Sequence, residues 1–351
     1  MNMPLPKGIC FMERYDFIAS QAPGRKKYVK YKRVMKKTLL IIPLLLLFIT
    51  ACETRGDKFP RFEVKETLLG RINEHVITEV SFINERTGFV AISEDTLMKT
   101  ADGCKTFTRV LVDSSAIFEG IRFVNEYIGF VIDRNNFLFK TIDGGKSWEK
   151  IKIDISGASL QDIKCLNQDT LFIAAGGDTL LNEGYIIKSM DGGKTWASTR
   201  TRNLSHICFV DNITGFACGY RGIIKTTDSG KTWDTISTLS SDDILFIDKN
   251  TGYASDKRSL YKTIDGGRNW KLVKTIISPS WIMGEDLSRI ECLNLINKKD
   301  LIFTLNARLI KVTSDQKWFQ YEFTRPYYQL QMIGPDRGVV YGFENLILVD
   351  F

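Results

Sequence analysis

Short apolar triplets recur along most of the chain and predict a series of short β-strands. Successive triplets begin 37 to 46 residues apart. The seven triplets are Val80-Ser81-Phe82, Ile121-Arg122-Phe123, Ile163-Lys164-Cys165, Ile207-Cys208-Phe209, Ile244-Leu245-Phe246, Ile290-Glu291-Cys292 and Leu330-Gln331-Met332. This spacing indicates one structural unit repeated seven times.

A second apolar signature follows six of the seven triplets after six positions, as in Gly88-Phe89 and Gly215-Phe216. A polar turn such as Asn84-Glu85-Arg86 separates the two signatures, so each pair is expected to form a hairpin. A third strand then ends in a lysine that stands three residues before an aspartate, or four in the sixth repeat. These lysines are Lys99, Lys140, Lys188, Lys225, Lys262 and Lys311.

The aspartates after the third strands head the most specific motif of the chain. Residues 141–148 read Thr-Ile-Asp-Gly-Gly-Lys-Ser-Trp, and the pattern returns at 189–196, 226–233 and 263–270. These segments resemble the Asp-box, or BNR repeat, S/T-x-D-x-G-x-x-W. The copy at 100–107 is weaker because Cys104 and Phe107 replace Gly and Trp, and the copy at 313–318 is two residues short.

The chemistry expected of this motif is structural. Asp accepts amide protons of the turn, Gly adopts a backbone angle closed to other residues, and Trp packs between neighbouring sheets. Sialidases carry the same box away from their active centre, so the resemblance implies a structural role here too. The residues assigned to this role are Asp102, Asp143, Gly145, Trp148, Asp191, Gly193, Trp196, Asp228, Gly230, Trp233, Asp265, Gly267 and Trp270.

A repeat of about 42 residues with four short strands is typical of a β-propeller blade. Six boxes are followed by a fourth strand, whereas the seventh repeat stops at Phe351 after its third strand, 346–349. The segment 61–69 precedes the first repeat and can supply the missing strand, which removes the exposed sheet edges. We therefore predict an all-β fold, a seven-bladed β-propeller of four-stranded antiparallel blades, closed by pairing the N-terminal strand with the last blade.

The repeated K-T-x-D-G-G-K-T-W turns in a single ring are similar to those of BNR-type propellers related to the photosystem II assembly factor family. More distantly, the chain resembles sortilin-type propellers and xyloglucanases. The resemblance covers residues 61–351 and implies the propeller fold. It implies no particular activity, because propellers serve as hydrolases, lectins and scaffolds alike.

The first fifty residues have the features of a targeting segment. An apolar run of about 14 residues, 38–51, follows Lys36 and Lys37; it is too short to span a bilayer and fits the hydrophobic region of a signal peptide. Ile49-Thr50-Ala51-Cys52 resembles a bacterial lipobox, which implies acylation of Cys52. The alternative is an ordinary secretory signal with a chance cysteine.

These features divide the chain into four parts. We expect residues 1–34 to be a mis-assigned upstream extension, 35–51 the lipoprotein signal peptide, 52–60 a tether and 61–351 the propeller.

The formal charge of +7 is concentrated in the targeting segment. Residues 1–51 hold ten Lys and Arg but two acidic residues, so the mature chain is close to neutral and gives no indication of nucleic-acid binding. Apart from Cys10 and Cys52, the chain has five cysteines and no C-x-x-C pair, so neither a disulfide framework nor a zinc site is indicated. Cys208 and Cys218 flank one hairpin and are either paired or two buried thiols.

Residues suited to catalysis are scarce. Only His75 and His206 are present, which argues against His-based nucleophilic catalysis and against a His metal cluster. Neither Arg61-Phe62 nor Arg325-Pro326 reproduces the Arg-Ile-Pro signature that a sialidase resemblance would require. Two acidic residues on different blades could still form a glycosidase pair, so a carbohydrate-active hydrolase stays the alternative to a non-catalytic binding protein.

Binding is expected on the face opposite the Asp-box turns. In a four-stranded blade the box and the first hairpin turn share one face, while the second-to-third-strand loops and the links between blades form the other. Trp281, the one tryptophan outside the repeat motif, lies there in a long loop. The ligand-binding candidates are Trp281, Arg134, Asp178, Glu183, Tyr220, Arg221, Arg258, Arg325 and Tyr327. Alternatively, Trp281 packs into its own loop and the charged loop tips are merely solvated.

The sequence as a whole predicts a monomeric scaffold propeller in the bacterial cell envelope, at the outer membrane or cell surface. It would bind an envelope protein or glycan without cofactor, metal or nucleic acid, and would contact the membrane through its lipid anchor only.

Overall fold

The computed structural model describes residues 57–71, 76–92, 95–176, 183–276, 289–305, 308–323, 329–342 and 345–351. The expected upstream extension, signal peptide and acylated Cys52 lie outside these residues. In the described part, 28 strands form seven four-stranded sheets, and neighbouring strands within the sheets are antiparallel. Each sheet is called a blade here and numbered in chain order.

The strands of the first four blades have the following bounds. They are β2 (Ile77–Phe82), β3 (Gly88–Ile92), β4 (Thr96–Thr100) and β5 (Thr108–Val112) in blade 1; β6 (Phe118–Phe123), β7 (Gly129–Asp133), β8 (Phe137–Thr141) and β9 (Glu149–Lys152) in blade 2; β10 (Ser159–Cys165), β11 (Leu171–Gly176), β12 (Gly184–Ser189) and β13 (Ala197–Thr201) in blade 3; and β14 (His206–Phe209), β15 (Gly215–Gly219), β16 (Gly222–Thr226) and β17 (Asp234–Ser237) in blade 4.

The remaining three blades complete the set. Their strands are β18 (Asp243–Phe246), β19 (Gly252–Asp256), β20 (Ser259–Thr263) and β21 (Lys271–Thr275) in blade 5; β22 (Ile290–Ile296), β23 (Asp300–Leu305), β24 (Arg308–Val312) and β25 (Trp318–Glu322) in blade 6; and β26 (Gln329–Met332), β27 (Arg337–Gly342), β28 (Asn345–Asp350) and β1 (Lys65–Arg71) in blade 7.

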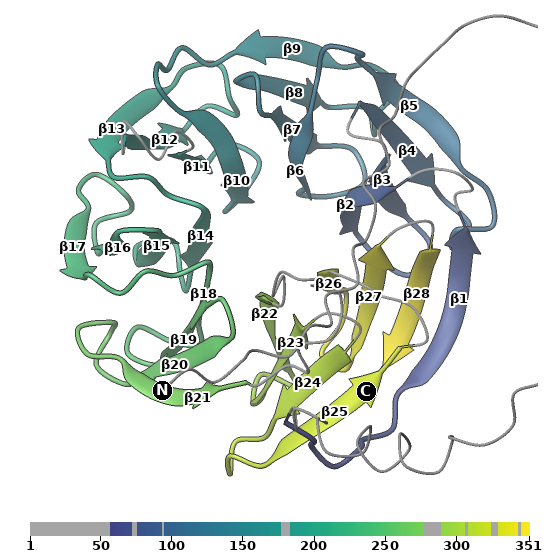
Figure 1. Ribbon diagram of the computed structural model, residues 1–351. Coiled ribbons are helices and arrows are strands. Elements are labelled where there is room, and N and C mark those ends of the chain that lie inside the picture. The colour runs from purple at the N-terminus through teal and green to yellow at the C-terminus, as the bar shows by residue number, and fades with distance from the viewer. Residues whose placement is uncertain are drawn as a thin grey trace, which may run out of the picture. The chain divides into compact units, whose positions relative to one another are not determined.

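The seven blades follow one another around a ring, with the first strand of each blade innermost (Figure 1). Six blades keep the chain order of their strands, as in β2-β3-β4-β5, whereas the seventh has the order β1-β28-β27-β26. The predicted seven-bladed propeller of antiparallel blades is therefore confirmed.

Ring closure brings the two ends of the propeller into one sheet. β1 pairs with β28 from Lys65 opposite Asp350 to Arg71 opposite Asn345, as the orphan N-terminal strand led us to expect. The strand begins four residues later than the predicted segment 61–69, because Arg61 instead forms a parallel bridge with Gln320 of blade 6.

The inner strands secure the same junction between blades 7 and 1. Gln331 of β26 accepts the Phe82 N–H at 2.8 Å through Oε1 and donates to the Phe82 carbonyl at 3.3 Å through Nε2. One glutamine thus satisfies both backbone groups of a neighbouring inner strand.

The sixth blade departs from the prediction. The equivalent of the triplet Ile290-Glu291-Cys292 lies three residues further on, at 293–295, because Leu295 pairs with Leu301 as Phe82 pairs with Gly88 in blade 1. A β-bulge lies between Glu291 and Asn294, at the start of this triplet, and Cys292 within the bulge has a positive φ of 54°. The predicted triplet in this blade was therefore wrong.

Aromatic side chains explain the glycines that open the second strands. Phe123 of β6 stacks on Phe89 of blade 1, with ring centroids 3.5 Å apart, and lies edge-on to Trp148 of its own blade at 6.2 Å. A Cβ atom at Gly129 would overlap the Phe123 ring. The triplet, the Gly-Phe signature and the box tryptophan thus meet in one buried contact between neighbouring blades.

Candidate functional site

The Asp-box segment of blade 4 shows how the polar groups of this motif are used. Asp228 Oδ1 accepts the backbone N–H groups of Lys231 and Thr232, each at 3.0 Å, and Oδ2 accepts the Thr232 hydroxyl at 2.7 Å. Thr226 Oγ1 donates to Asp228 and accepts the Gly230 N–H, both at 2.8 Å. These bonds, led by those from Thr232, hold the pKa of Asp228 well below its usual range.

The other copies repeat this arrangement with small variations. The aspartates that accept bonds in the same way are Asp102, Asp143, Asp191 and Asp265. In the weaker copy, Cys104 adopts a φ of 65° in place of glycine, and its N–H donates to Thr100 Oγ1 at 2.9 Å. The box carboxylates are therefore engaged within their own turns.

The lysines that end the third strands connect neighbouring blades. Three of them each donate to a backbone carbonyl of the next blade's Asp-box at 2.7 Å, in the pairs Lys99–Gly144, Lys140–Gly192 and Lys188–Ser229. A fourth, Lys225, reaches the Gly266 carbonyl at 3.5 Å. The repeated lysine is thus a contact between blades, which the sequence pattern alone did not indicate.

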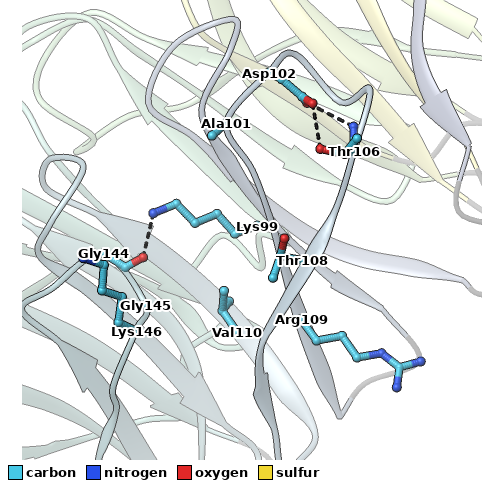
Figure 2. A pocket seen from close by; sticks show the side chains of 10 residues that line it. All are labelled: Lys99, Ala101, Asp102, Thr106, Thr108, Arg109, Val110, Gly144, Gly145 and Lys146. Carbon is cyan, nitrogen blue, oxygen red and sulfur yellow. Dashed lines mark hydrogen bonds between the residues drawn. The ribbon is translucent and has the colours of Figure 1, made fainter.

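A cavity of about 560 Å³ lies beside the first of these contacts, between blades 1 and 2. Lys99 points across it to the Gly144 carbonyl, Asp102 on its wall is bonded to Thr106, and Arg109 extends away from both (Figure 2). A cavity of about 480 Å³ lies between corresponding elements of blades 5 and 6. In the first cavity, Lys99, Asp102 and Thr106 are engaged in these bonds.

Charged side chains of the inner strands meet near the centre of the ring. Arg122 of β6 donates to Glu79 Oε1 at 3.1 Å and to Asp162 Oδ1 at 3.2 Å, so it joins blades 1, 2 and 3. His206 Nδ1 lies 3.7 Å from Asp162 Oδ2 and 4.0 Å from Asp243 Oδ1, which joins blades 3, 4 and 5. These five residues, together with Lys164 at 3.6 Å from Asp162, are called the axial cluster here.

Backbone contacts fix the acids of the axial cluster in place. Asp162 Oδ2 accepts the Ile207 N–H of the next blade at 3.1 Å, and Asp243 Oδ2 accepts the Leu293 N–H at 2.8 Å. The side chain of Asp162 is only 6% exposed, whereas those of Arg122 and His206 are 30% and 46% exposed. The acids are therefore held by the frame of the ring, and the basic groups are the ones open to a ligand.

The protonation of the axial cluster reflects burial and its partners. Burial raises the pKa of Glu79 despite the opposing effect of Arg122. Burial acts in the same direction on Asp162, but Lys164, His206 and Arg122 together hold its pKa well below the usual range. Burial would lower the pKa of His206, yet Asp162 and Asp243 outweigh it and raise that pKa.

Two members of the axial cluster, His206 and Asp243, lie toward the face on which binding is expected. Each inner strand ends at the first hairpin turn, which bonds the Asp-box, as the Gly144 N–H does with the Tyr127 carbonyl at 2.8 Å. The strands therefore begin at the opposite face. His206 and Asp243 are the first residues of β14 and β18, so they stand near that face.

The structure describes five of the nine ligand-binding candidates. Arg134 forms an ion pair with Glu119, and Glu183 forms one with Arg200, so neither side chain is simply solvated. Tyr220 is exposed in the loop between β15 and β16, and the carbonyl of its neighbour Arg221 accepts a bond from Arg202 at 3.4 Å.

The remaining candidates add little to a common site. The Arg258 carbonyl accepts the Ile276 N–H at 2.9 Å, within blade 5. Trp281, Asp178, Arg325 and Tyr327 lie outside the described residues. Among the described candidates, Tyr220 and Arg221 are adjacent in sequence, whereas the ion pairs of Arg134 and Glu183 are with residues outside the candidate set.

Sequence reasoning missed the axial cluster. The available signal was the polar residue at the centre of several triplets, such as Arg122 and Lys164, together with acids just before the triplets, such as Glu79 and Asp162. A central triplet position alternates with the two apolar ones and so faces the other side of its strand. In an innermost strand, that other side faces the middle of the ring.

The five cysteines in the described part of the chain are free thiols, so Cys208 and Cys218 are not paired there. Cys208 lies opposite Phe216, and Cys218 opposite His206, in the β14–β15 ladder. Burial raises the pKa of the Cys208 thiol to about 12.

No group of three or more His, Cys, Asp or Glu side chains suited to a metal ion occurs among the residues with described positions. The same residues include no helix long and apolar enough to cross a membrane.

Comparison with known proteins supports the family resemblance. Residues 71–156 match the family model described as photosynthesis system II assembly factor YCF48. No curated protein sequence matches the chain significantly.

Solved structures show the same fold over most of the chain. A structure titled "YCF48 bound to D1 peptide" has a TM-score of 0.65 and 20% identity and covers 83% of this chain and 97% of its own. YCF48 from Cyanidioschyzon merolae has a TM-score of 0.62 and 15% identity and covers 81% and 98%. A streptogramin B lyase has a TM-score of 0.64 at 8% identity and covers 82% and 97%. The predicted resemblance to the photosystem II assembly factor family is thus confirmed, and the fold is shared with at least one enzyme.

Proposed function

We propose that this protein is a non-catalytic binding propeller, anchored by lipid at Cys52 in the bacterial cell envelope, that holds a protein partner over the axial cluster. The observation that carries the proposal is the partial exposure of Arg122 and His206 above acids fixed by the backbone. Charged groups that are held in place but still open to solvent can bind a partner's charged side chains with little loss of conformational entropy.

The polar groups that are already bonded within the propeller indicate which face binds the partner. On the Asp-box face, the box carboxylates and the third-strand lysines are engaged in turns and in contacts between blades. Toward the opposite face, His206 pairs with Cys218, two residues before the exposed Tyr220 in the β15–β16 loop, which also carries Arg221. Tyr and Arg are the residue types enriched in protein interfaces.

A protein partner is favoured over a glycan by analogy with a similar propeller. One YCF48 structure that shares this fold is described as bound to a D1 peptide. The analogy concerns the kind of ligand only, and photosynthesis does not enter the proposal. Envelope location rests on the lipobox-like segment Ile49-Thr50-Ala51-Cys52.

The geometry of the axial acids disfavours the hydrolase alternative. A glycosidase needs two carboxyl groups that face each other across the scissile bond. Here Arg122 occupies the position between Glu79 and Asp162 and bonds to both. An active hydrolase at this site would have to displace a buried ion pair to admit its substrate.

The test is capture of a partner by the tagged full-length protein from its native envelope, with three variants beside it. Asp243→Asn removes one charge of the axial cluster but keeps an oxygen that can accept the Leu293 N–H. The double variant Tyr220→Ala/Arg221→Ala alters the exposed loop between β15 and β16. Glu126→Gln changes an exposed acid in the first hairpin turn of blade 2, on the Asp-box face, and is the matched control.

We expect a protein retained by the parent and by Glu126→Gln, and lost with Asp243→Asn. Equal retention by all variants would contradict the proposed site. Turnover of fluorogenic sialosides or polysaccharides, abolished by Glu79→Gln, would establish the hydrolase instead.

A further inference from the structure

The described chain enters the propeller between blades 5 and 6. Residues 57–62 run along the outer strand β25, where the Gln320 N–H donates to the Pro60 carbonyl at 2.8 Å and the Phe62 N–H to the Gln320 carbonyl at 3.2 Å (Figure 1). Phe59 stacks on Trp318 with ring centroids 5.3 Å apart. Residues 57–62 are called the entry segment here.

Blade 5 holds the beginning of the entry segment. Lys274 of β21 lies 3.2 Å from Asp57 Oδ1, and its Nζ is 5.5 Å from the centre of the Phe59 ring. Val273 belongs to the same buried cluster as Phe59 and Trp318. The position of Asp57 is thus fixed against the outer edge of blade 5.

Apolar side chains are exposed beside this entry point. Ile264, in the Asp-box of blade 5, is 75% exposed, and Leu272 of β21 is 50% exposed. Both line the cavity of about 480 Å³, together with Trp270 and Val273, so the exposed residues continue into the apolar cluster around Phe59.

Basic side chains surround these exposed residues. Lys262 and Lys271 line the same cavity, and Arg268 is exposed in the same Asp-box. The nearby acid, Asp265, is engaged by the N–H groups of Arg268 and Asn269 at 3.1 and 3.0 Å. The edge therefore combines exposed apolar groups with a net positive charge. These residues, 262, 264, 268, 271 and 272, are called the blade 5 edge.

The length of the intervening chain limits how far the blade 5 edge can be from an anchored Cys52. Cys52 precedes Asp57 by five residues, and five extended residues span at most about 18 Å. This step rests on the lipid anchor of the proposed function. An anchored Cys52 would keep the point where Asp57 is held within that distance of the bilayer.

We infer that the blade 5 edge is a membrane-contact surface that lies on an anionic lipid bilayer. Ile264 and Leu272 insert at the boundary between headgroups and acyl chains, while Lys262, Arg268 and Lys271 face anionic headgroups. Contact at this outer edge leaves the face with the axial cluster open to a partner. The inference goes beyond the sequence expectation, in which the lipid anchor alone touches the membrane.

The repeat supplies a matched control. Ile142 occupies the position of Ile264 in the Asp-box of blade 2 and is 67% exposed. It has the same local turn and a comparable exposure, but it is three blades away along the chain from the entry segment. A general affinity of apolar box residues for lipid would affect both positions, whereas contact through the blade 5 edge would affect only Ile264.

The experiment uses the full-length protein, purified in detergent and reconstituted in vesicles of phosphatidylethanolamine and phosphatidylglycerol. Single variants Ile264→Cys and Ile142→Cys are labelled with a polarity-sensitive fluorophore, and lipids carrying nitroxides serve as quenchers. The unlabelled parent, treated in parallel, gives the background from the native thiols. Mass spectrometry of the N-terminal peptide reports separately whether Cys52 is acylated.

We expect acylated Cys52 and quenching at position 264 at least about twofold stronger than at 142, because a side chain at the acyl boundary lies within reach of the nitroxides. A further variant, Leu272→Asp in the Ile264→Cys background, should reduce that quenching.

Three other outcomes would overturn the inference, and they are distinguishable. Acylated protein with no quenching at 264 would leave the anchor standing but refute the contact. Equal quenching at 264 and 142 would show that lipid contact is not confined to blade 5. Absence of acylation at Cys52 would refute the proposed anchor and, with it, the distance argument on which the contact depends.

Discussion

Arg122 is the residue whose replacement tests the axial cluster most directly. The change Arg122→Met keeps an unbranched side chain but removes the charge shared by Glu79 and Asp162. Both acids would then lose a compensating positive charge, although the side chains of Glu79 and Asp162 are only 15% and 6% exposed. Removing one partner of a buried ion pair costs about 3–5 kcal/mol of stability, because the other charge stays buried.

The remaining contacts place this variant at the lower end of that range. Asp162 keeps Lys164 at 3.6 Å and the Ile207 N–H at 3.1 Å, and Glu79 keeps the Tyr341 hydroxyl at 3.5 Å. We therefore expect a loss of about 3 kcal/mol in the free energy of unfolding. At about 2–4 °C per kcal/mol for a domain of this size, the Tm should fall by about 6–12 °C.

The assay is urea unfolding of the parent and of Arg122→Met, repeated at acid and neutral pH. Burial already raises the pKa of Glu79, and loss of Arg122 should raise it further. A carboxyl group with a raised folded-state pKa destabilises the fold above its unfolded pKa, so the deficit of the variant should shrink as the pH falls and Glu79 takes up a proton. Adding Glu79→Gln should recover part of the loss at neutral pH. A variant within about 0.5 kcal/mol of the parent would refute the reasoning, since that is the range of ordinary surface changes.

Three further expectations follow from other sites. The raised pKa of His206 should add stability that is fully present below about pH 6.5, the pKa of an unfolded histidine, and is lost as the pH rises through the pKa of the folded state. The variant His206→Gln should flatten this part of the profile of unfolding free energy against pH. An unchanged profile would show that His206 is not the group responsible. Trp233→Ala should cost about 3–5 kcal/mol and Asp228→Ala should also lower the Tm, as thermal unfolding can measure; no shift with either would contradict the structural role of the Asp-box. Cys218, fully buried with a raised pKa, should resist iodoacetamide at pH 8 until urea unfolds the protein, and rapid alkylation of the native protein would show that blade 4 opens.

The fold could be predicted because each blade repeats a contact between residues close in sequence. Gly129 follows Phe123 by six residues, and its Cβ position is filled by that ring, so the spacing of the two signatures is a packing requirement. The closing strand could be predicted because the seventh repeat has only three strands where the others have four. Such a blade has an unpaired edge until another strand covers it. The position of the triplet in blade 6 could not be predicted, because residues 290–292 and 293–295 have the same apolar-polar-apolar pattern and only the pairing of Leu295 with Leu301 distinguishes them.

The axial cluster could not be predicted from the sequence, for a different reason. Arg122 contacts Glu79 and Asp162 at separations of 43 and 40 residues, one repeat to either side. The repeat predicts that all three residues lie on inner strands. It does not predict that their positions along these strands allow the side chains to meet. Glu79 and Asp162 lie three residues before the ends of their triplets, whereas Arg122 lies one residue before the end of its own, so their contact depends on how far the side chains reach. The spacing of the apolar residues carries no information on that reach.

Irregularity of the repeat also marks the place where the chain enters the ring. In blades 1 to 4, each third-strand lysine bonds to the next blade's Asp-box. Within the described residues, Lys262 of blade 5 makes no such bond to the shortened box of blade 6. The entry segment spans this junction instead, through Lys274 on one side and Gln320 on the other. Because Cys52 precedes that segment by five residues, a force on the proposed lipid anchor would act first on the junction between blades 5 and 6. The contacts of Arg122 with Glu79 and Asp162 lie in blades 1 to 3, away from that junction, which separates the proposed attachment of the protein from this part of its proposed binding site.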